Sequence, residues 1–374
     1  MKSGIPVLCS LLVFCHASPG ETVTSEAHRF RVEPVAENLD HPWAVEKLPD
    51  GRFLVTERQG NLLLIDRAGA PPQNIAGVPP VFARGQGGLL DVELHPDYAE
   101  NGWIYLTFSK PTGKGALTSV VRAKLDGGKL ADLETIFEPP ADQATEAVVH
   151  FGSRIAFDGR GNFFFSIGDR GGPTNPRNLA QSLSSVTGKI HRLRDDGAVP
   201  PDNPFVATPG AMPSIWAYGV RNPQGLVYDT ASARLWETEH GPRGGDELNI
   251  IRKGANYGWP VATFGINYSG TTITDKTSLP GMEDPVAQWT PVIAASGLAL
   301  YRGDKFPRWQ GNLFAGGLAG QRLVRIELSG AIVAAQEILL KDTGRIRDVR
   351  VFDDGFLYVV YDEPGKVVRL VPAE

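Results

Sequence analysis

The sequence predicts an all-β protein, and more specifically a six-bladed β-propeller of four-stranded antiparallel blades. One observation is a loose repeat, in which an apolar alternating run, a turn with Asp or Gly and a second apolar run follow one another. Glycines and prolines, 43 and 29 in number, fall singly or in pairs between short alternating runs, as in chains with many β-turns. Long segments with helical periodicity are lacking, and only Asn178–Ser185 is expected to form one short helix.

The repeated units follow one another along almost the whole chain. They lie at residues 42–66, 88–109, 153–169, 224–241, 297–318 and 346–371. In each unit the period of two predicts two inner strands of an antiparallel sheet. The turns between the runs read PDG, HPDY, DGRG, DTAS, GDKFPRWQG and DDG in chain order. Such repetition is typical of a propeller, whose closed ring leaves few free strand edges. A two-sheet sandwich or two separate β domains are the alternatives, but the middle of the chain has no linker-like break.

The first 17 residues have the pattern of a secretory signal peptide. Lys2 supplies a positive charge, Ile5–Cys15 is mostly apolar, and Ala17 is a small residue at which a peptidase can cut. This apolar run is too short to span a bilayer, and no later stretch reaches the length of a membrane helix. We therefore expect export to the periplasm or the medium, with a propeller catalytic domain at residues 30–374.

Cysteine content and charge exclude several classes of function. Both cysteines, Cys9 and Cys15, lie in the predicted signal, so the mature chain would have no disulfide, thiolate metal site or cysteine nucleophile. Lipid attachment at Cys15 is an alternative that the large Phe14 disfavours. The net charge is −5, and no basic run stands out, so nucleic-acid binding has little electrostatic support.

The segment EHGPRGGDELNII, Glu239–Ile251, has the composition of a cation site. Its glycines and a proline expose backbone carbonyls, and Glu239, Asp246 and Glu247 add carboxylates. Ca²⁺ prefers such oxygen ligands. The spacing is not that of an EF-hand, so surface charges are the alternative interpretation.

Three further residues are candidates for acid–base chemistry or ligand contact. His150 precedes the third unit, and an imidazole there can serve as a general base or be merely structural. Gln86 is flanked by glycines that allow close approach of backbone to a ligand. Asp169 ends the run FFFSIGD, where it can orient a histidine or cap a turn.

Arginines form the second group of candidates. Arg221 and Asn222 lie in YGVRNPQGL, and Asn before Pro favours a tight loop. Arg345 and Arg347 alternate along one predicted strand and so share a face. Two guanidiniums on one face suggest a carboxylate-rich ligand, although a charged outer face is the alternative.

Six stretches carry a family resemblance, namely HFGSRIAFD, SIGDRGG, YGVRNPQGL, TEHGPRGGDELN, GANYGWP and RIRDVRV. Together they resemble the soluble sugar dehydrogenases that depend on pyrroloquinoline quinone (PQQ), in particular the periplasmic aldose sugar dehydrogenase branch of the glucose/sorbosone dehydrogenase family. The resemblance covers residues 35–371, and RNPQG and EHGP-x₃-DE-x-N are its specific parts. It implies a six-bladed propeller that holds the quinone flat over the channel mouth beside a Ca²⁺ ion and oxidises aldoses at the anomeric carbon to lactones.

The resemblance also implies roles for the catalytic candidates. His150 matches the base that takes the proton from the anomeric hydroxyl while hydride passes to the quinone C5. Asp169 would support His150, and Arg221, with Ca²⁺, would polarise the C5 carbonyl and stabilise the developing oxyanion. Asn222 and Gln86 would contact the cofactor or the substrate.

Ligands of two cations are implied in the same way. The carbonyls of Gly241 and Pro242 match ligands of the Ca²⁺ ion that the cofactor also binds. Glu247 and the backbone of Tyr257 match ligands of a second, structural Ca²⁺.

The remaining cofactor contacts include one departure from the family pattern. Arg345 and Arg347 would pair with carboxylates of the cofactor. The family often places a lysine against the cofactor in the fifth unit, whereas this chain reads GGLAGQR, with Ala319 near that place and Arg322 as a candidate substitute.

Two other classes of function stay open on the sequence. A propeller lactonase or other hydrolase would need acidic or amide ligands converging on the channel, and the arginine pair fits it poorly. A non-catalytic propeller that binds carbohydrate or protein is favoured by the absent lysine. The dehydrogenase interpretation requires an aldose substrate and an external electron acceptor, and it fits a monomer or a homodimer.

Overall fold

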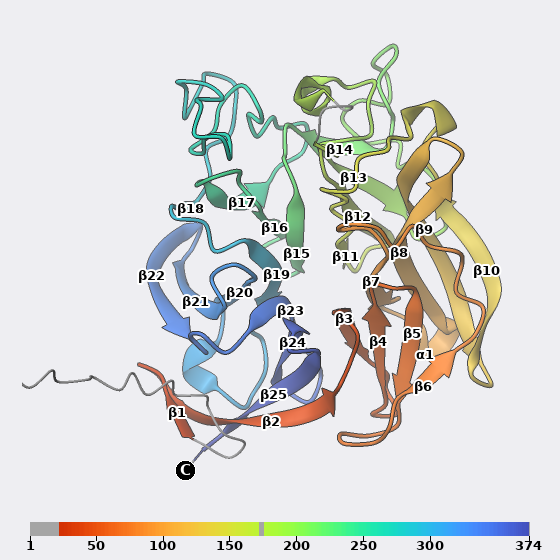
Figure 1. Ribbon diagram of the computed structural model, residues 1–374, viewed down its shortest axis with the longest axis vertical. Coiled ribbons are helices and arrows are strands. Elements are labelled where there is room, and N and C mark those ends of the chain that lie inside the picture. Colours follow the sequence, from red (N-terminus) through yellow and green to blue (C-terminus); the bar gives the residue numbers. More distant parts are fainter. Residues whose placement is uncertain (1–21, 172–175, 374) are drawn as a thin grey trace, which may run out of the picture.

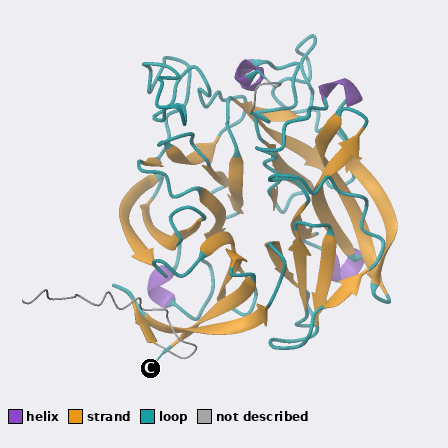
Figure 2. Ribbon diagram, viewed as in Figure 1, coloured by secondary structure: helices purple, strands orange, loops and turns teal. Residues whose placement is uncertain are grey.

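The computed structural model describes residues 22–171 and 176–373 of the chain. Six antiparallel sheets surround a central axis, and strands and loops make up nearly all of the described chain (Figures 1 and 2). The predicted six-bladed propeller is thereby confirmed. Residues 1–17, the expected signal peptide, lie outside the described ranges. Within those ranges, every helix is too short or too polar to traverse a bilayer.

Each of the first three blades has four antiparallel strands, and strands that follow one another in the chain lie side by side in the sheet. Blade 1 consists of β3 (Pro42–Lys47), β4 (Phe53–Glu57), β5 (Asn61–Ile65) and β6 (Gln73–Ile75). Blade 2 consists of β7 (Leu89–Leu94), β8 (Trp103–Thr112), β9 (Gly115–Asp126) and β10 (Lys129–Phe137). Blade 3 consists of β11 (Ile155–Phe157), β12 (Asn162–Ile167), β13 (Lys189–Arg194) and β14 (Ile215–Tyr218).

The last three blades continue this pattern, but the sixth gains a strand. Blade 4 consists of β15 (Pro223–Asp229), β16 (Arg234–Glu239), β17 (Asp246–Ile251) and β18 (Ala287–Trp289). Blade 5 consists of β19 (Ala295–Leu300), β20 (Leu313–Gly317), β21 (Arg322–Ser329) and β22 (Ile332–Leu339). Blade 6 consists of β23 (Arg345–Val351), β24 (Leu357–Glu363), β25 (Lys366–Pro372), β2 (Arg29–Glu37) and β1 (Thr22–Thr24). The helices are α1 (Tyr98–Asn101) and the 3₁₀ turns η1 (Ala141–Gln143), η2 (Arg177–Gln181) and η3 (Pro307–Trp309).

Blade 6 closes the ring by joining the two ends of the described chain. Strand β2 pairs with β25, with Val32 opposite Leu370, and β1 adds a fifth strand outside β2. The propeller sheet therefore includes residues on the N-terminal side of the expected start at residue 30. Closure of this kind covers sheet edges that would otherwise be free to pair with other chains.

The hydrophobic core is divided into six clusters, one between each pair of neighbouring blades. Alternation along single strands distributes side chains between these clusters. On β12, Phe163 and Phe165 pack towards blade 2, whereas Phe164 packs towards blade 4. Because neighbouring residues of a strand point to opposite faces, each blade is apolar on both faces and contributes to two clusters.

Ion pairs cross the central channel below the candidate site. Arg154 lies just before β11, and its Nη1 atom is 2.9 Å from Asp91 Oδ1 on β7 and 2.8 Å from Asp348 Oδ1 on β23. All three side chains are buried. These contacts join the inner regions of blades 2, 3 and 6 around the axis.

The expected helix at Asn178–Ser185 is instead the short 3₁₀ helix η2, which ends at Gln181. The ammonium group of Lys189 donates to the carbonyl oxygens of Leu179, at 3.0 Å, and Ala180, at 2.9 Å. These carbonyls would accept bonds from later N–H groups if an α-helix continued. Lys189 thus helps to satisfy the carbonyls at the end of this short helix.

Candidate active site

The predicted functional residues lie at one end of the blades because of the blade topology. His150 and Arg221 lie just before the inner strands β11 and β15, while Asp169 and Gly241 lie just after the second strands β12 and β16. In an antiparallel pair, the start of one strand and the end of the next are at the same end of the sheet. Ring closure then brings these ends of all blades to one mouth of the channel.

His150 and Asp169 form a hydrogen-bonded pair at this mouth. The imidazole Nδ1 lies 2.6 Å from Asp169 Oδ1. Because an ionised carboxylate only accepts hydrogen bonds, Nδ1 carries the proton and Nε2 carries the lone pair. A Cβ on Gly168 would lie only 2.4 Å from the His150 carbonyl oxygen, so a glycine there allows the two loops to approach. The pair presents Nε2 as a proton acceptor.

Two other donors hold the Asp169 carboxylate in place. The Gly171 N–H donates to Oδ1 at 2.8 Å, and the indole Nε1–H of Trp259 donates to Oδ2 at 2.6 Å. Burial opposes ionisation of this carboxylate, but the hydrogen bond from His150, the nearby Arg221 and the Trp259 bond outweigh it and lower the pKa of Asp169. Asp169 is therefore an anion at neutral pH.

Burial lowers the pKa of His150, and the positive charge of Arg221 lowers it further, against the opposing effect of Asp169. The imidazole is consequently neutral at pH 7, in the form that accepts a proton. Its side chain remains partly accessible, with 13% exposed. A neutral, oriented and accessible imidazole has the properties of a general base.

Gln86 supports the backbone of the histidine loop. Its Oε1 atom accepts a hydrogen bond from the His150 N–H at 2.7 Å, and its own N–H donates to the Val148 carbonyl at 2.8 Å. Gly85 has a φ of +60°, and a Cβ there would lie 2.4 Å from the Val148 oxygen. Gln86 therefore lies directly beside His150 at the channel mouth.

Arg221 and Asn222 occupy the tight loop between β14 and β15. Both of their backbone N–H groups donate to one carboxylate oxygen of Glu239, which is buried. The Arg221 guanidinium donates through Nη1 to the carbonyls of His240 and Gly241, at 2.7 Å each. The predicted turn thus places a guanidinium against the backbone segment that was expected to bind a cation.

Arg345 and Arg347 lie at the start of β23, on the same side of the channel mouth. Arg345 Nε is 3.3 Å from Asp362 Oδ2, and Arg347 lowers the pKa of the same carboxyl group despite its burial. Arg347 Nη1 donates to Gln224 Oε1 at 2.8 Å. The amide of Gln224 in turn donates to Asn222 Oδ1 at 3.2 Å, so Arg347 is linked to the Arg221–Asn222 loop.

Several buried side-chain nitrogen atoms at this mouth have no hydrogen-bond partner among the described residues. They are the Nε atoms of Arg221 and Arg347 and the Nε2 atom of His240. Burial lowers the pKa of Arg347 to about 10, so it is still charged at pH 7. Buried polar groups are normally paired, and unpaired guanidinium N–H groups indicate that an acceptor-rich ligand belongs here.

The residues predicted to bind cations line one small cavity. The cavity is lined by Glu239, Gly241, Pro242, Glu247 and Tyr257, among others. The volume open to the centre of a water-sized sphere in this cavity is about 10 Å³. This corresponds to roughly one water molecule or ion.

Three carboxyl groups at or near that cavity have raised pKa values. Burial raises the pKa of Glu247 to about 7, and burial together with neighbouring carboxylates raises the pKa values of Glu237 and Glu239 well above the usual range. Three buried carboxyls in close succession repel one another when ionised, and a divalent cation would relieve this repulsion.

Ala319 is exposed in the turn between β20 and β21, and no hydrogen bond of the described residues connects it to the other predicted site residues. Arg322 folds over the same turn, where its Nε donates to the Gly320 carbonyl at 2.7 Å. A guanidinium therefore does lie at the turn in which the family often has a lysine.

Sequence reasoning missed three contributors to the site. Trp259 and Gln224 fall within the motifs GANYGWP and RNPQG, but their roles depend on partners far away in the chain. The third is His41, whose Nδ1 lies 2.9 Å from Asp362 Oδ1 beside Arg345.

The chain matches the family model described as "Glucose / Sorbosone dehydrogenase" over residues 39–369. It belongs to this family. The chain is 44% identical to the aldose sugar dehydrogenase YliI from Escherichia coli, over 91% of this chain and 92% of that protein. The propeller also superposes on solved family members. For the apo form of the soluble E. coli aldose sugar dehydrogenase the TM-score is 0.86, with 42% identity and coverage of 92% of this chain and 100% of that chain.

A family member with bound cofactor is similar as well. The PQQ-bound form of an aldose sugar dehydrogenase from Streptomyces coelicolor is 32% identical, with a TM-score of 0.75, over 91% of this chain and 98% of that chain. The family assignment predicted from the six sequence stretches is thus confirmed.

Proposed function

We propose that this protein is an exported, PQQ-dependent aldose dehydrogenase that oxidises the anomeric carbon of a sugar to a lactone. The observation that carries the proposal is that a neutral His150, paired with Asp169, meets two guanidiniums at one mouth of the channel. Each guanidinium has a buried N–H without a partner in residues 22–171 and 176–373. Loss of the anomeric C–H hydride and the O–H proton converts the cyclic hemiacetal into a lactone. The reaction thus needs a base and a two-electron acceptor.

The residues at the mouth fit a quinone that carries carboxylates. Arg221 and Arg347 offer buried N–H groups that lack acceptors among the described residues, and Arg345 adds a third guanidinium. Charge-assisted hydrogen bonds from guanidinium to carboxylate are stronger than neutral ones. The PQQ-bound relative from S. coelicolor further supports this cofactor.

The cation residues fit Ca²⁺ in kind and in space. The carbonyls of Gly241 and Pro242 are hard oxygen donors beside the small cavity, and the Arg221 guanidinium takes only one lone pair of the Gly241 oxygen. Glu247 and the Tyr257 backbone, expected as ligands of a second Ca²⁺, line the same one-ion cavity, where a single Ca²⁺ would already offset the repulsion among the buried carboxyls.

Each chain residue then has a physical role. His150 Nε2 takes the proton of the anomeric hydroxyl, and Asp169 holds the ring in the required tautomer and balances the charge of the imidazolium that forms. Arg221 stabilises negative charge that develops near the carbonyls of His240 and Gly241. When bound, the quinone supplies the two-electron acceptor and Ca²⁺ the Lewis acid. An external electron acceptor must reoxidise the enzyme after each turnover.

The decisive experiment combines cofactor binding with turnover. The mature protein is incubated with PQQ and Ca²⁺, binding is followed by the absorbance of the quinone, and dye reduction is measured with a panel of aldoses. We expect turnover that is lost in His150→Ala and retained in His28→Ala, a matched control on the turn between β1 and β2. Absence of PQQ binding, or full turnover in His150→Ala, would refute the proposal.

Export is tested separately, because residues 1–17 lie outside the described part of the chain. N-terminal sequencing of protein recovered from the periplasm or medium should begin close to residue 18. Recovery only from the cytoplasm, with residue 1 or 2 at the N-terminus, would contradict the expected signal peptide.

A further inference from the structure

A second histidine–aspartate pair lies at the channel mouth, where blade 1 meets blade 6. His41 lies just before the inner strand β3, as His150 lies just before β11, and both residues have a positive φ, of +49° and +55°. The imidazole Nδ1 of His41 is 2.9 Å from Oδ1 of Asp362, which is near the end of β24. The two histidines therefore have equivalent places in the fold, although the proposed chemistry uses only His150.

Asp362 is surrounded by positive groups as well as by His41. Its Oδ2 atom is 3.3 Å from Nε of Arg345, so the carboxylate bridges the imidazole and this guanidinium. Burial opposes its ionisation, but the charge of Arg347, the hydrogen bond from His41 and the charge of Arg58 outweigh burial and lower the pKa of Asp362. Because an ionised carboxylate only accepts hydrogen bonds, Nδ1 of His41 is the donor.

The hydrogen bond from His41 decides how the Asp362 carboxylate is turned. Since Oδ1 accepts from the imidazole, Oδ2 is the oxygen that faces Arg345. In the other pair the roles are reversed, because there the Asp169 carboxylate orients the imidazole of His150. The imidazole of His41 thus has a carboxylate to orient, and through it a guanidinium.

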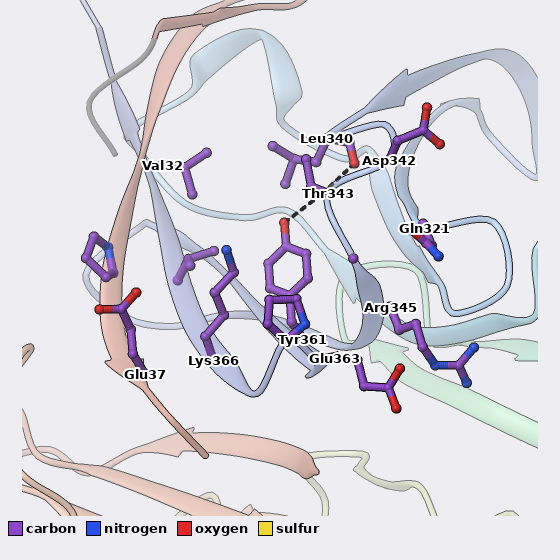
Figure 3. Close-up of a pocket in the computed structure, with 14 residues that line it drawn as sticks. Val32, Glu37, Gln321, Leu340, Asp342, Thr343, Arg345, Tyr361, Glu363 and Lys366 are labelled. Carbon is purple, nitrogen blue, oxygen red and sulfur yellow. Dashed lines mark hydrogen bonds between the residues drawn. The ribbon is translucent and has the colours of Figure 1, made fainter. Parts of the chain in front are cut away.

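Arg345 depends on this contact more than Arg347 depends on any one partner. The Arg345 side chain is 36% exposed, and Asp362 is its one hydrogen-bond or ion-pair partner among the described residues. It also borders a pocket of about 460 Å³ between blades 5 and 6, and Figure 3 shows its guanidinium directed away from Tyr361. Arg347, in contrast, is buried and donates to Gln224. The pocket leaves room for other rotamers of Arg345, and fixing an arginine side chain costs conformational entropy.

We propose that His41 is a positioning residue, which acts through Asp362 to fix the Arg345 guanidinium for a carboxylate of the cofactor. This inference rests on the proposed PQQ-dependent function, which places a carboxylate-rich quinone at the mouth. A guanidinium that is already oriented loses less conformational freedom when the ligand binds, so its hydrogen bonds contribute more to affinity. His41 therefore strengthens cofactor binding, although it takes no part in proton or hydride transfer.

The first test compares two substitutions of His41 by isothermal titration of PQQ into the protein with Ca²⁺. His41→Gly removes the donor and suits the positive φ at this position. It should weaken PQQ binding about tenfold, the order expected for one hydrogen bond to a charged group. His41→Asn keeps an N–H at the position of Nδ1 and also tolerates a positive φ, so its affinity should stay within about twofold of the wild-type value. An equal loss in both variants would overturn the inference.

Asp362→Asn is a second variant, which keeps the test informative if His41→Gly does not fold. It removes the negative charge that holds Arg345, so it should weaken PQQ binding at least as much as His41→Gly does.

The second test is a double-mutant cycle with Arg345→Met, which removes the guanidinium and keeps a long side chain. When His41→Gly is added to Arg345→Met, the dissociation constant of PQQ should change less than about twofold, because no guanidinium is left to position. If His41 only supported the fold of its loop, His41→Gly would cause the same loss of affinity in both backgrounds, and the inference would be wrong.

A third titration separates this inference from the proposed function. It uses isophthalate, an aromatic dicarboxylate that has no quinone group. If PQQ does not bind, but isophthalate binds more weakly to His41→Gly and Arg345→Met than to the wild-type protein and His41→Asn, the dehydrogenase function fails while the positioning role stands. Wild-type affinity for PQQ in His41→Gly, or binding of neither compound to the wild-type protein, overturns the positioning role.

Discussion

The substitution Asp169→Asn replaces one carboxylate oxygen of the residue that supports the candidate base His150. Its effect can be worked out from the hydrogen bonds of Asp169. Three donors, from His150, Gly171 and Trp259, converge on the two carboxylate oxygens at 2.6 to 2.8 Å. An asparagine has one acceptor oxygen and must direct its NH₂ group towards at least one of these donors. Depending on the orientation, one N–H (Trp259) or two (His150 and Gly171) of these donors lose their acceptor, and the negative charge beside the imidazole is lost.

The magnitudes follow from these two losses. One unsatisfied buried N–H costs about 1–3 kcal/mol of unfolding free energy. The hydrogen bond from His150 to a charged acceptor is worth about 1.5–3 kcal/mol, so loss of this support for the imidazolium should lower kcat by about 10- to 100-fold. The pKa of His150 should also fall, because Asp169 is the group that raises it against burial and Arg221.

Two assays check this prediction independently of each other. Dye-coupled turnover with PQQ and Ca²⁺ gives kcat, and an NMR titration of the histidine ring signals in the protein without quinone gives the His150 pKa. Asp126→Asn is the matched control, because this exposed carboxylate is remote from the pair. An unchanged His150 pKa in Asp169→Asn, with normal kcat, would show that the contact does not tune the imidazole.

Three further predictions concern charge stabilisation, pH and ring closure. Arg221→Ala should lower kcat by about 10²–10³-fold, as for loss of one oxyanion donor, and unchanged turnover in the dye assay would remove this role. His191 is buried, and burial lowers its pKa to about 3, so its contribution to stability is complete above about pH 6.5 and is lost as the pH falls. Between pH 7.5 and 5.0 this loss is about 2 kcal/mol, and urea unfolding should show that His191→Gln removes it; an identical pH dependence in both proteins would contradict the assignment. Phe30→Ala should cost about 3–5 kcal/mol, because Phe30 is fully buried between β2 and blade 5, and an unchanged urea midpoint would argue against β2 as the closing strand.

Much of the fold was predictable because its signals are local. Alternation such as FFFSI in β12 is visible in the sequence, and the structure sends Phe163 and Phe165 to one interface and Phe164 to the other. The outer strands and the fifth strand of blade 6 were not predictable in the same way. Strand β1 has only three residues, and its pairing with β2 depends on the ring that β2 and β25 have already closed.

The site was predictable where a residue type implies its chemistry. His150, Asp169 and Arg221 stand in distinctive turns, and the structure brings all three together. Trp259 was not identified as the second partner of Asp169, since the two are 90 residues apart and an indole N–H has no fixed role in a motif. Gln224 was likewise not identified, because its bond to Arg347 spans 123 residues and joins blade 4 to blade 6.

By itself, the sequence determined the class of structure, the family and the chemical inventory of the site. The period of two and the turn residues are properties of neighbouring residues, and they require no knowledge of distant contacts. Only the tertiary structure decided which donors meet which acceptors. It also decided that the guanidiniums of Arg221 and Arg347 keep N–H groups without a partner among the described residues, and that a pocket opens beside Arg345. The physical reason is that ring closure sets these distances, and closure is a property of all six blades together.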